Sequence, residues 1–377
     1  MRRVPDRWGL LAVLLLLLGS ACTSGKPSGT PGTPGSSAAV PQSFTVDVDA
    51  QSPQIPLVAD AYFPSSLEVH PGDMVSFVER YSGEPHTVTL GSLVNQSIGQ
   101  VSGTSLVGLP PFFPAAGDPV PSAAQPCFLD TGVPPVTRAC QSGPQPSFTG
   151  FQSFYNSGWL AQGATFSVTV SANAASGTYH FVDLAHPTTM SGQLQVVPLS
   201  QHIPSPSQVS QAGAAQLAQA VQAQAPAAQE AATVTTTLVA GITESRVTNT
   251  FVAALGPASV TASVRQVLSW TLYGEHALAL NPPAGAVGLL MEGGNGTIHL
   301  NPQVTTRVGG VAPPPGLGAK PITMSGGSYS GNAFHNSGLL ESTPPNFITY
   351  TLAFSAAGTY SLRCLIHPSM QETITVG

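Results

Sequence analysis

The chain has 377 residues, enough for two domains and a linker, yet only 7% of them are charged and the formal net charge is -6. This balance offers no basic face, so it excludes nucleic acid as a partner. The 39 glycines and 36 prolines, with short alternating runs of Val, Thr and Ser between them, predict an all-β protein with many turns.

Residues 1–22 have the pattern of an export signal. A basic start is followed by an apolar run, Leu10–Leu18, that is too short to span a bilayer as a mature helix. Small residues then precede Cys22, which resembles a bacterial lipobox, although Gly19 stands where Leu is commoner. We therefore expect an extracytoplasmic protein anchored to the bacterial cell membrane by lipidated Cys22, with ordinary secretion as the alternative. Residues 23–42, rich in Gly, Ser, Pro and Thr, are expected to form a flexible tether.

The first globular block covers residues 43–198. Phe44–Val48 alternates as a strand, two further strands flank the turn at Pro71-Gly72-Asp73, and another follows at His86–Leu90. These short alternating runs separated by turn residues predict a β-domain.

An insertion from Ser92 to Thr149 interrupts this block and carries two of the four cysteines. We expect it to be a long loop region near the site end of the domain. In an exported protein, Cys127 and Cys140 would form a disulfide that closes a small loop.

Residues 199–233 change composition to Ala and Gln and are predicted to link two domains. Within them, residues 208–224 could form a weak helix, because Val209, Leu217 and Val221 recur at helical spacing. A helix packed near the domain junction is favoured over a disordered linker.

The second block, residues 234–377, ends in a loop with metal-binding chemistry. Cys364, His367 and Met370 follow one another at three-residue intervals, with β-type residues on both sides. A thiolate and an imidazole bind copper strongly, and a thioether can serve as a weak axial ligand. A blue-copper site needs one more histidine, and His276 is available at the start of another β-type segment.

The pattern Gly-Thr-Tyr-x-x-x-Cys-x-x-His-Pro-x-Met before a final strand resembles the cupredoxin family, and the loop spacing is closest to amicyanin-like members. The resemblance implies a Greek-key β-sandwich that holds one type 1 (blue) copper and carries out one-electron transfer. It also implies that His367 lies at a solvent edge as the port for electrons. The implied copper ligands are His276, Cys364, His367 and Met370.

An internal repeat indicates two copies of this fold. Tyr81–His86 echoes Tyr273–His276, and Gly177-Thr178-Tyr179 echoes Gly358-Thr359-Tyr360. We therefore expect two tandem cupredoxin-type Greek-key β-sandwiches joined by the Ala/Gln-rich linker.

The first copy has an incomplete ligand set, because Asp stands where the second copy has its Cys. The corresponding residues are His86, Asp183, His186 and Met190. Two imidazoles and a carboxylate could hold a second, weakly bound divalent ion. The alternative is a degenerate domain in which Asp183 is solvated near the surface.

These residues predict an exported electron carrier, with redox partner proteins at the membrane or cell surface. One alternative is copper capture or delivery at the cell surface. A two-domain copper oxidase or nitrite reductase is a further alternative, but such enzymes commonly use His-x-His pairs, and this chain has none. We therefore expect an electron carrier and not a catalyst.

Overall fold

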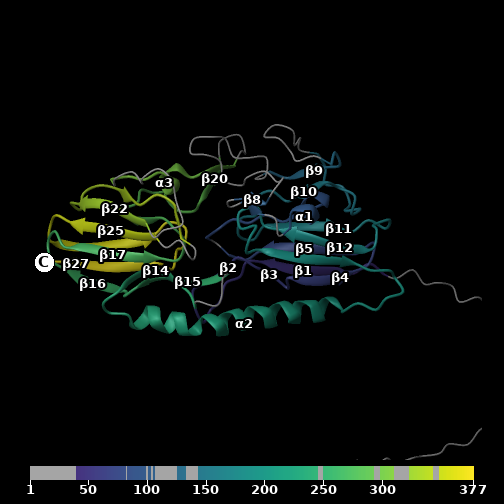
Figure 1. Ribbon diagram of the computed structural model, residues 1–377, viewed down its shortest axis with the longest axis horizontal. Helices are drawn as coiled ribbons and strands as arrows, with labels where there is room; N and C mark the ends of the chain where they lie inside the picture. The colour runs from purple at the N-terminus through teal and green to yellow at the C-terminus, as the bar shows by residue number, and fades with distance from the viewer. Residues whose placement is uncertain are drawn as a thin grey trace, which may run out of the picture. The chain divides into compact units, whose positions relative to one another are not determined.

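The computed structural model describes residues 40–377 except 82, 99–100, 103–104, 107–124, 133–142, 245–248, 293–297, 310–321 and 343–347. Most elements in this part of the chain are strands, arranged in several sheets (Figure 1). The predicted export signal, Cys22 and most of the tether lie outside the described residues. No helix in the described parts is long and apolar enough to cross a membrane.

The N-terminal half, residues 43–198, contains two sheets. In β1 (Ser43–Val48) buried side chains alternate with more exposed ones, as expected for a strand with one face on a core. The buried aromatic rings of Phe77 and Phe181, which come from different sheets, meet edge to face with their centroids 5.1 Å apart. The first sheet has the order β11 (Thr165–Thr169), β5 (Met74–Glu79), β1, β3 (Tyr62–Phe63); the second has the order β4 (Ser66–Val69), β13 (Ser191–Val196), β12 (Gly177–Val182), β6 (Thr89–Leu90), β10 (Phe154–Asn156), β9 (Cys127–Leu129).

The C-terminal half, residues 234–377, also contains two main sheets, and its core includes Trp270 and Tyr350, both fully buried. One strand of its first sheet comes from the N-terminal half, because Leu57–Ala59 pairs with Thr250–Val252. The first sheet has the order β2 (Leu57–Ala59), β15 (Thr250–Gly256), β14 (Leu238–Ile242), β17 (Val267–Leu272), β25 (Ile348–Phe354), β22 (Ile322–Tyr329); the second has the order β16 (Ser259–Ala262), β27 (Gln371–Val376), β26 (Gly358–Cys364), β19 (Leu278–Leu280), β23 (His335–Asn336).

The same pairing order recurs in the two halves. Strands β1 and β5 are parallel and β5 pairs antiparallel with β11; β14, β17 and β25 repeat this pattern. Hairpin β12–β13 lies between β6 and β4, as hairpin β26–β27 lies between β19 and β16. The sequence repeat thus corresponds to a repeat of strand topology.

Smaller elements complete the described chain. They are α1 (Ser92–Ser97), α3 (Pro302–Thr305) and the two-stranded pairs β7 (Val101–Ser102) with β8 (Ser105–Leu106), β18 (Gly274–His276) with β24 (Leu340–Ser342), and β20 (Leu290–Glu292) with β21 (Ile298–Leu300). Cys127 is buried in β9, whereas Cys140 lies outside the described residues, so the disulfide remains a prediction.

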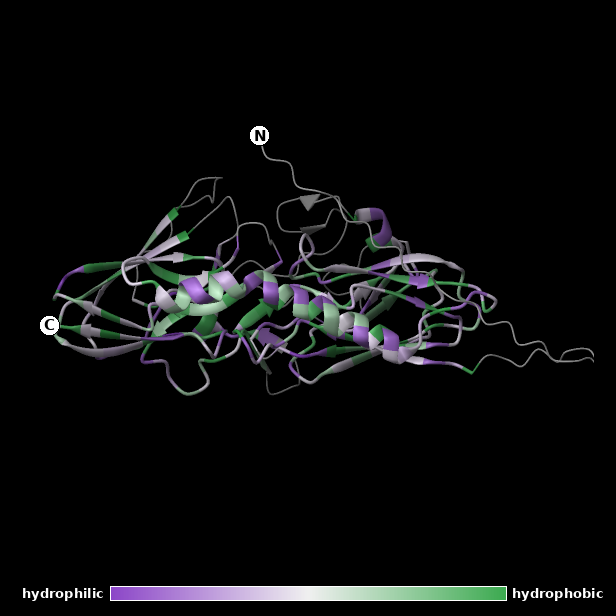
Figure 2. Cartoon of the chain, turned by 90° about the horizontal axis from the view of Figure 1, so that it is seen from below, coloured by the Kyte–Doolittle hydropathy of each residue, from purple (hydrophilic) through white to green (hydrophobic). Residues whose placement is uncertain are grey.

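Helix α2 (Pro206–Thr233) occupies the segment between the halves and is longer than the predicted 208–224. A capping box starts it, because Ser205 and Gln208 each bond the other's backbone N–H. The helix packs against β1 and β3 as well as β14 and β15. Figure 2 shows hydrophobic and hydrophilic residues mixed along it, in line with its Ala/Gln composition.

Buried His335 gives a test of the C-terminal core. Its Nε2 lies 2.8 Å from the Tyr350 hydroxyl, and burial, helped by the charge of Arg307, lowers the pKa of His335 below 6.5. The unfolded chain therefore binds a proton at His335 more readily than the folded chain does. The contribution of neutral His335 to the free energy of unfolding is present above pH 6.5 and is lost as the pH falls below that value.

We expect wild-type protein to lose more unfolding free energy than His335→Gln when the pH falls from about 7 to about 5. Denaturant unfolding of both proteins at each pH measures this difference. Equal pH slopes would contradict the placement of a neutral His335 in the core.

Candidate metal centre

Three of the four predicted copper ligands, His276, Cys364 and His367, bring their donor atoms together in the C-terminal half. Strand β26 ends at Cys364, the loop to β27 carries His367 and Met370, and β18 ends at His276. The loop is closed by hydrogen bonds from Cys364 N–H to Met370 O (3.1 Å) and from Met370 N–H to His367 O (3.0 Å). A two-strand ladder therefore fixes the ends of the ligand loop.

The donor atoms are spaced for one metal ion. His276 Nδ1 and His367 Nδ1 are 3.2 Å apart, and Cys364 Sγ lies 3.9 and 3.5 Å from them, respectively. An ion at about 2.0–2.3 Å from nitrogen and sulfur needs donors at such separations. His276, His367 and Met370 are fully buried and Cys364 is 3% exposed, so the set suits a soft ion shielded from water.

Hydrogen bonds select the imidazole nitrogen that faces this position. His276 Nε2 lies 2.6 Å from the carbonyl oxygen of Tyr273, and His367 Nε2 lies 2.7 Å from Glu84 Oε1. Both partners accept, so each Nε2 carries the proton and each Nδ1 is left as a donor to a metal.

The surroundings of the third donor, Cys364 Sγ, favour its thiolate form. In the metal-free chain, burial acts to raise the pKa of the Cys364 thiol, but the charge of a His367 ring protonated at both nitrogens and hydrogen bonds to both histidines lower it well below its usual value. A bound metal ion would take the place of the proton on Nδ1. Cys364 takes no part in a disulfide. A thiolate is the form that binds metal.

Apolar side chains enclose the site. Leu365 and Ile366 are buried, and the Phe251 ring lies edge to face with His276 and His367, at centroid distances of 5.8 and 5.6 Å. The expectation that His367 lies at a solvent edge is wrong, because its Nε2 is covered by Glu84 of the N-terminal half.

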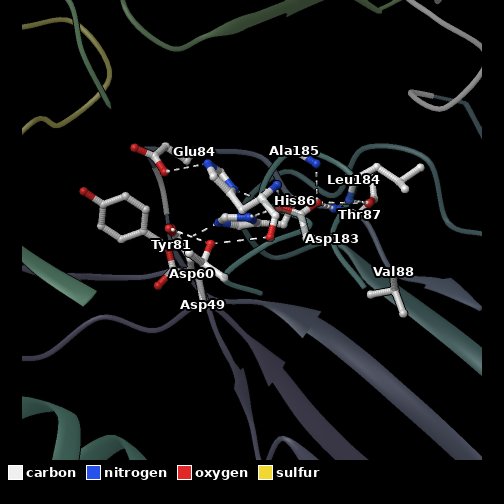
Figure 3. A network of polar contacts seen from close by, with 12 residues as sticks. Asp49, Asp60, Tyr81, Glu84, His86, Thr87, Val88, Asp183, Leu184 and Ala185 are labelled. Carbon is white, nitrogen blue, oxygen red and sulfur yellow. Dashed lines mark hydrogen bonds and ion pairs between the residues drawn. The ribbon is translucent and has the colours of Figure 1, made fainter. Parts of the chain in front are cut away.

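The N-terminal half contains the corresponding trio. Asp183 Oδ2 lies 3.0 Å from His86 Nδ1 and 2.9 Å from His186 Nδ1. Asp183 Oδ1 accepts hydrogen bonds from the backbone and hydroxyl of Thr87 (Figure 3). Asp183 is fully buried, which contradicts a solvated position near the surface.

Met190 is also fully buried and closes its loop as Met370 does, because its N–H donates to His186 O and its carbonyl accepts from Asp183 N–H. Burial acts to raise the pKa of Asp183, but hydrogen bonds from His186 and His86 lower it well below its usual value. A charged carboxylate between two imidazoles suits a divalent ion, and it suits protons shared with the histidines equally well.

Sequence reasoning missed the acidic residues around both trios. Glu84 of the N-terminal half forms a hydrogen bond with His367 of the C-terminal half. Conversely, Oε1 of Glu275 in the C-terminal half lies 3.5 Å from Nε2 of His186 in the N-terminal half. Asp49 Oδ2 lies 3.4 Å from His86 Nε2. The available signal was the Glu shortly before the ligand His in both copies, in Tyr81–His86 and Tyr273–His276.

The sequence matches no family model and no curated protein. Among solved structures, an oxidized amicyanin variant is similar over 41% of this chain and 82% of its own, with 14% identity and a TM-score of 0.21. A reduced auracyanin from the photosynthetic bacterium Roseiflexus castenholzii is similar over 42% of this chain and 100% of its own, with 17% identity and a TM-score of 0.23. These neighbours are cupredoxins, and each likeness covers less than half of this chain.

Proposed function

We propose that this chain is an exported copper protein built from two tandem cupredoxin-type Greek-key domains, residues 43–198 and 234–377. The C-terminal domain holds one type 1 copper and serves in one-electron transfer. The observation that carries this proposal is the buried sulfur of Cys364 with two imidazole Nδ1 atoms at 3.5 and 3.9 Å from it.

Bound copper would supply a couple between Cu(II) and Cu(I). The protein contributes a fixed ligand frame, because the ligands lie on a hairpin and a short strand whose backbones are hydrogen-bonded. Leu365, Ile366 and Phe251 exclude water from the donors. Tyr273 and Glu84 hold the two imidazoles in the tautomer that binds metal.

Copper capture or delivery at the cell surface is the second candidate, and the trio of His86, Asp183 and His186 favours it. Copper stoichiometry measured beside the visible spectrum, on protein lacking residues 1–42, tests both proposals. One copper per chain with an intense blue band supports the electron carrier. A second, weakly coloured copper supports copper handling, and no blue band overturns the leading proposal.

The placement of the protein is proposed from its sequence. Cys22, after small residues, would receive a lipid and anchor the chain to the bacterial cell membrane on the extracytoplasmic side, with secretion as the alternative. Its partners would then be redox proteins at the membrane or cell surface. Pro368 and Ser369 are the exposed residues of the ligand loop and the nearest part of that loop to such a partner.

Glu84→Gln should raise the reduction potential of the copper centre by about 60–120 mV. Outer-shell partners are worth about 10–100-fold in metal affinity, and for one electron each tenfold is about 59 mV. The carboxylate near His367 Nε2 stabilises the more positive oxidized state, and glutamine keeps the shape without the charge.

A redox titration followed by the blue band measures this potential. Glu230→Gln, which removes the same charge at an exposed position of α2, is the matched control and should leave the potential unchanged. A potential that is equal in wild type and Glu84→Gln would mean that the contact between Glu84 and His367 does not tune the site.

A further inference from the structure

A second group of ligand-type side chains lies where the two halves meet. Asp60, Glu84 and His186 place ligand atoms within 4.8 Å of one another. Around His186 Nε2, Glu84 Oε2 lies at 4.0 Å and Glu275 Oε1 at 3.5 Å. Figure 3 draws Asp60 and Glu84 beside His86 and Asp183. We call Asp60, Glu84, His186 and Glu275 the junction cluster.

The junction cluster gathers three carboxyl groups in a largely buried place. Glu84 is 3% exposed and Glu275 is 6% exposed. Among the described residues, Glu84 and Glu275 form ion pairs only with histidines, and Asp60 forms none. Buried carboxylates are costly unless a cation or a proton compensates them.

Two oxygens of the cluster have no protein partner. Glu275 Oε2 and Asp60 Oδ1 are buried without a hydrogen bond in the described structure. Buried polar atoms in folded proteins are normally paired, so an orphaned oxygen in a cluster of ligands points to an ion. The side chain of Glu275 is almost wholly buried, and its other oxygen, Oε1, is directed at His186.

The orientation of His186 gives the same indication. Its Nδ1 lies 2.9 Å from Asp183 Oδ2, a charged acceptor, so Nδ1 carries a proton. In the neutral ring, Nε2 then presents a lone pair to Glu84 and Glu275. That arrangement is repulsive unless His186 carries a second proton, which these carboxylates favour by raising its pKa, or a cation takes the place of that proton.

We propose that Asp60, Glu84, His186 and Glu275 form a binding site for a hard divalent cation of the Mn²⁺ type. Carboxylate oxygens suit Mn²⁺, Mg²⁺ and Ca²⁺, and one imidazole among them favours a transition metal within that class. The site differs from the trio of His86, Asp183 and His186, because it uses Nε2 of His186 and not Nδ1. It also lies next to the candidate copper centre, since Glu84 contacts His367 through its other oxygen.

Titration of the metal-free full-length chain with Mn²⁺ tests this proposal, with free Mn²⁺ measured by its EPR signal. We expect one bound ion per chain, with Kd raised about 10–100-fold or more in Glu275→Gln and in Asp60→Asn. His86→Gln removes a member of the trio only and Cys364→Ser a member of the copper centre only. Both should leave the Kd for Mn²⁺ unchanged.

Three results would overturn the site. They are no Mn²⁺ binding by wild type, equal binding by all variants, and loss of binding in His86→Gln but not in Glu275→Gln. Unfolding midpoints of each variant separate loss of the site from loss of the fold. As a second measurement, electron spin-echo modulation of bound Mn²⁺ should show one coordinated imidazole nitrogen, whereas two would place the ion in the trio.

Discussion

Copper-loaded Cys364→Ser is expected to lack the intense blue band of the wild type and to keep its fold. A hydroxyl cannot supply the charge transfer between sulfur and copper that gives the colour, and it is a poor ligand for a soft ion. Copper affinity should fall by more than the about 10–100-fold that loss of an outer-shell partner costs.

The fold should survive because serine has nearly the same shape as cysteine and finds partners in His276 and His367. We expect a change in the free energy of unfolding of about 1 kcal/mol or less in metal-free protein. Visible and EPR spectra, with copper counted per chain, measure the loss of the site, and denaturant unfolding measures the fold.

Asp183→Asn is the matched control, since it changes the equivalent position of the other half. It should keep the blue band and lose any second, weakly coloured copper. A blue band that persists in Cys364→Ser would show that the thiolate of another residue holds the copper and would remove the basis of the proposed function.

The proximity of the candidate ligands in the hairpin loop could be predicted because their spacing is local. Cys364, His367 and Met370 lie within one hairpin loop, so the order of residues almost determines their proximity. His276 required a family pattern, and the structure brings its Nδ1 to 3.2 Å from that of His367. Asp183 likewise lies between His86 and His186, as the repeat implied.

The junction cluster could not be predicted in the same way. Glu84 and His367 are 283 positions apart, and their contact depends on how the two halves pack. No periodicity or motif encodes that packing. For the same reason the family resemblance, which concerns one domain at a time, led to the wrong expectation that His367 lies at a solvent edge.

Some of the fold shows the same limit. Alternating segments such as β1 were predicted from their own residues, because one face of each must be buried. Leu57–Ala59 is too short to have a pattern, and its pairing with β15 of the other half is a tertiary effect. Helix α2 extends past the predicted end because contacts with both halves hold a segment of low apolar content.

Gly241→Ala is expected to lower the free energy of unfolding and to disturb the proposed copper site. Gly241 has φ +72° at a bulge in β14, and an added Cβ would overlap the carbonyl oxygen of Tyr273 and fall 2.5 Å from His276 Nε2. Those two atoms form the hydrogen bond that orients His276. A left-handed alanine costs about 1–2 kcal/mol and overpacking about 1–3 kcal/mol, so a loss of about 2–5 kcal/mol is expected.

Gly285→Ala separates the two contributions, because Gly285 has φ +87° but nothing within 4 Å of an added Cβ. It should cost only the about 1–2 kcal/mol of backbone strain and leave the blue band unchanged. In Gly241→Ala, displacement of His276 should also weaken copper binding by about 10–100-fold and alter the EPR spectrum. If both variants lost the same stability, the close packing of Gly241 on the ligand histidine would be refuted. The bulge of β14 would then be a structural turn only, without a role in holding His276 in the tautomer that binds metal.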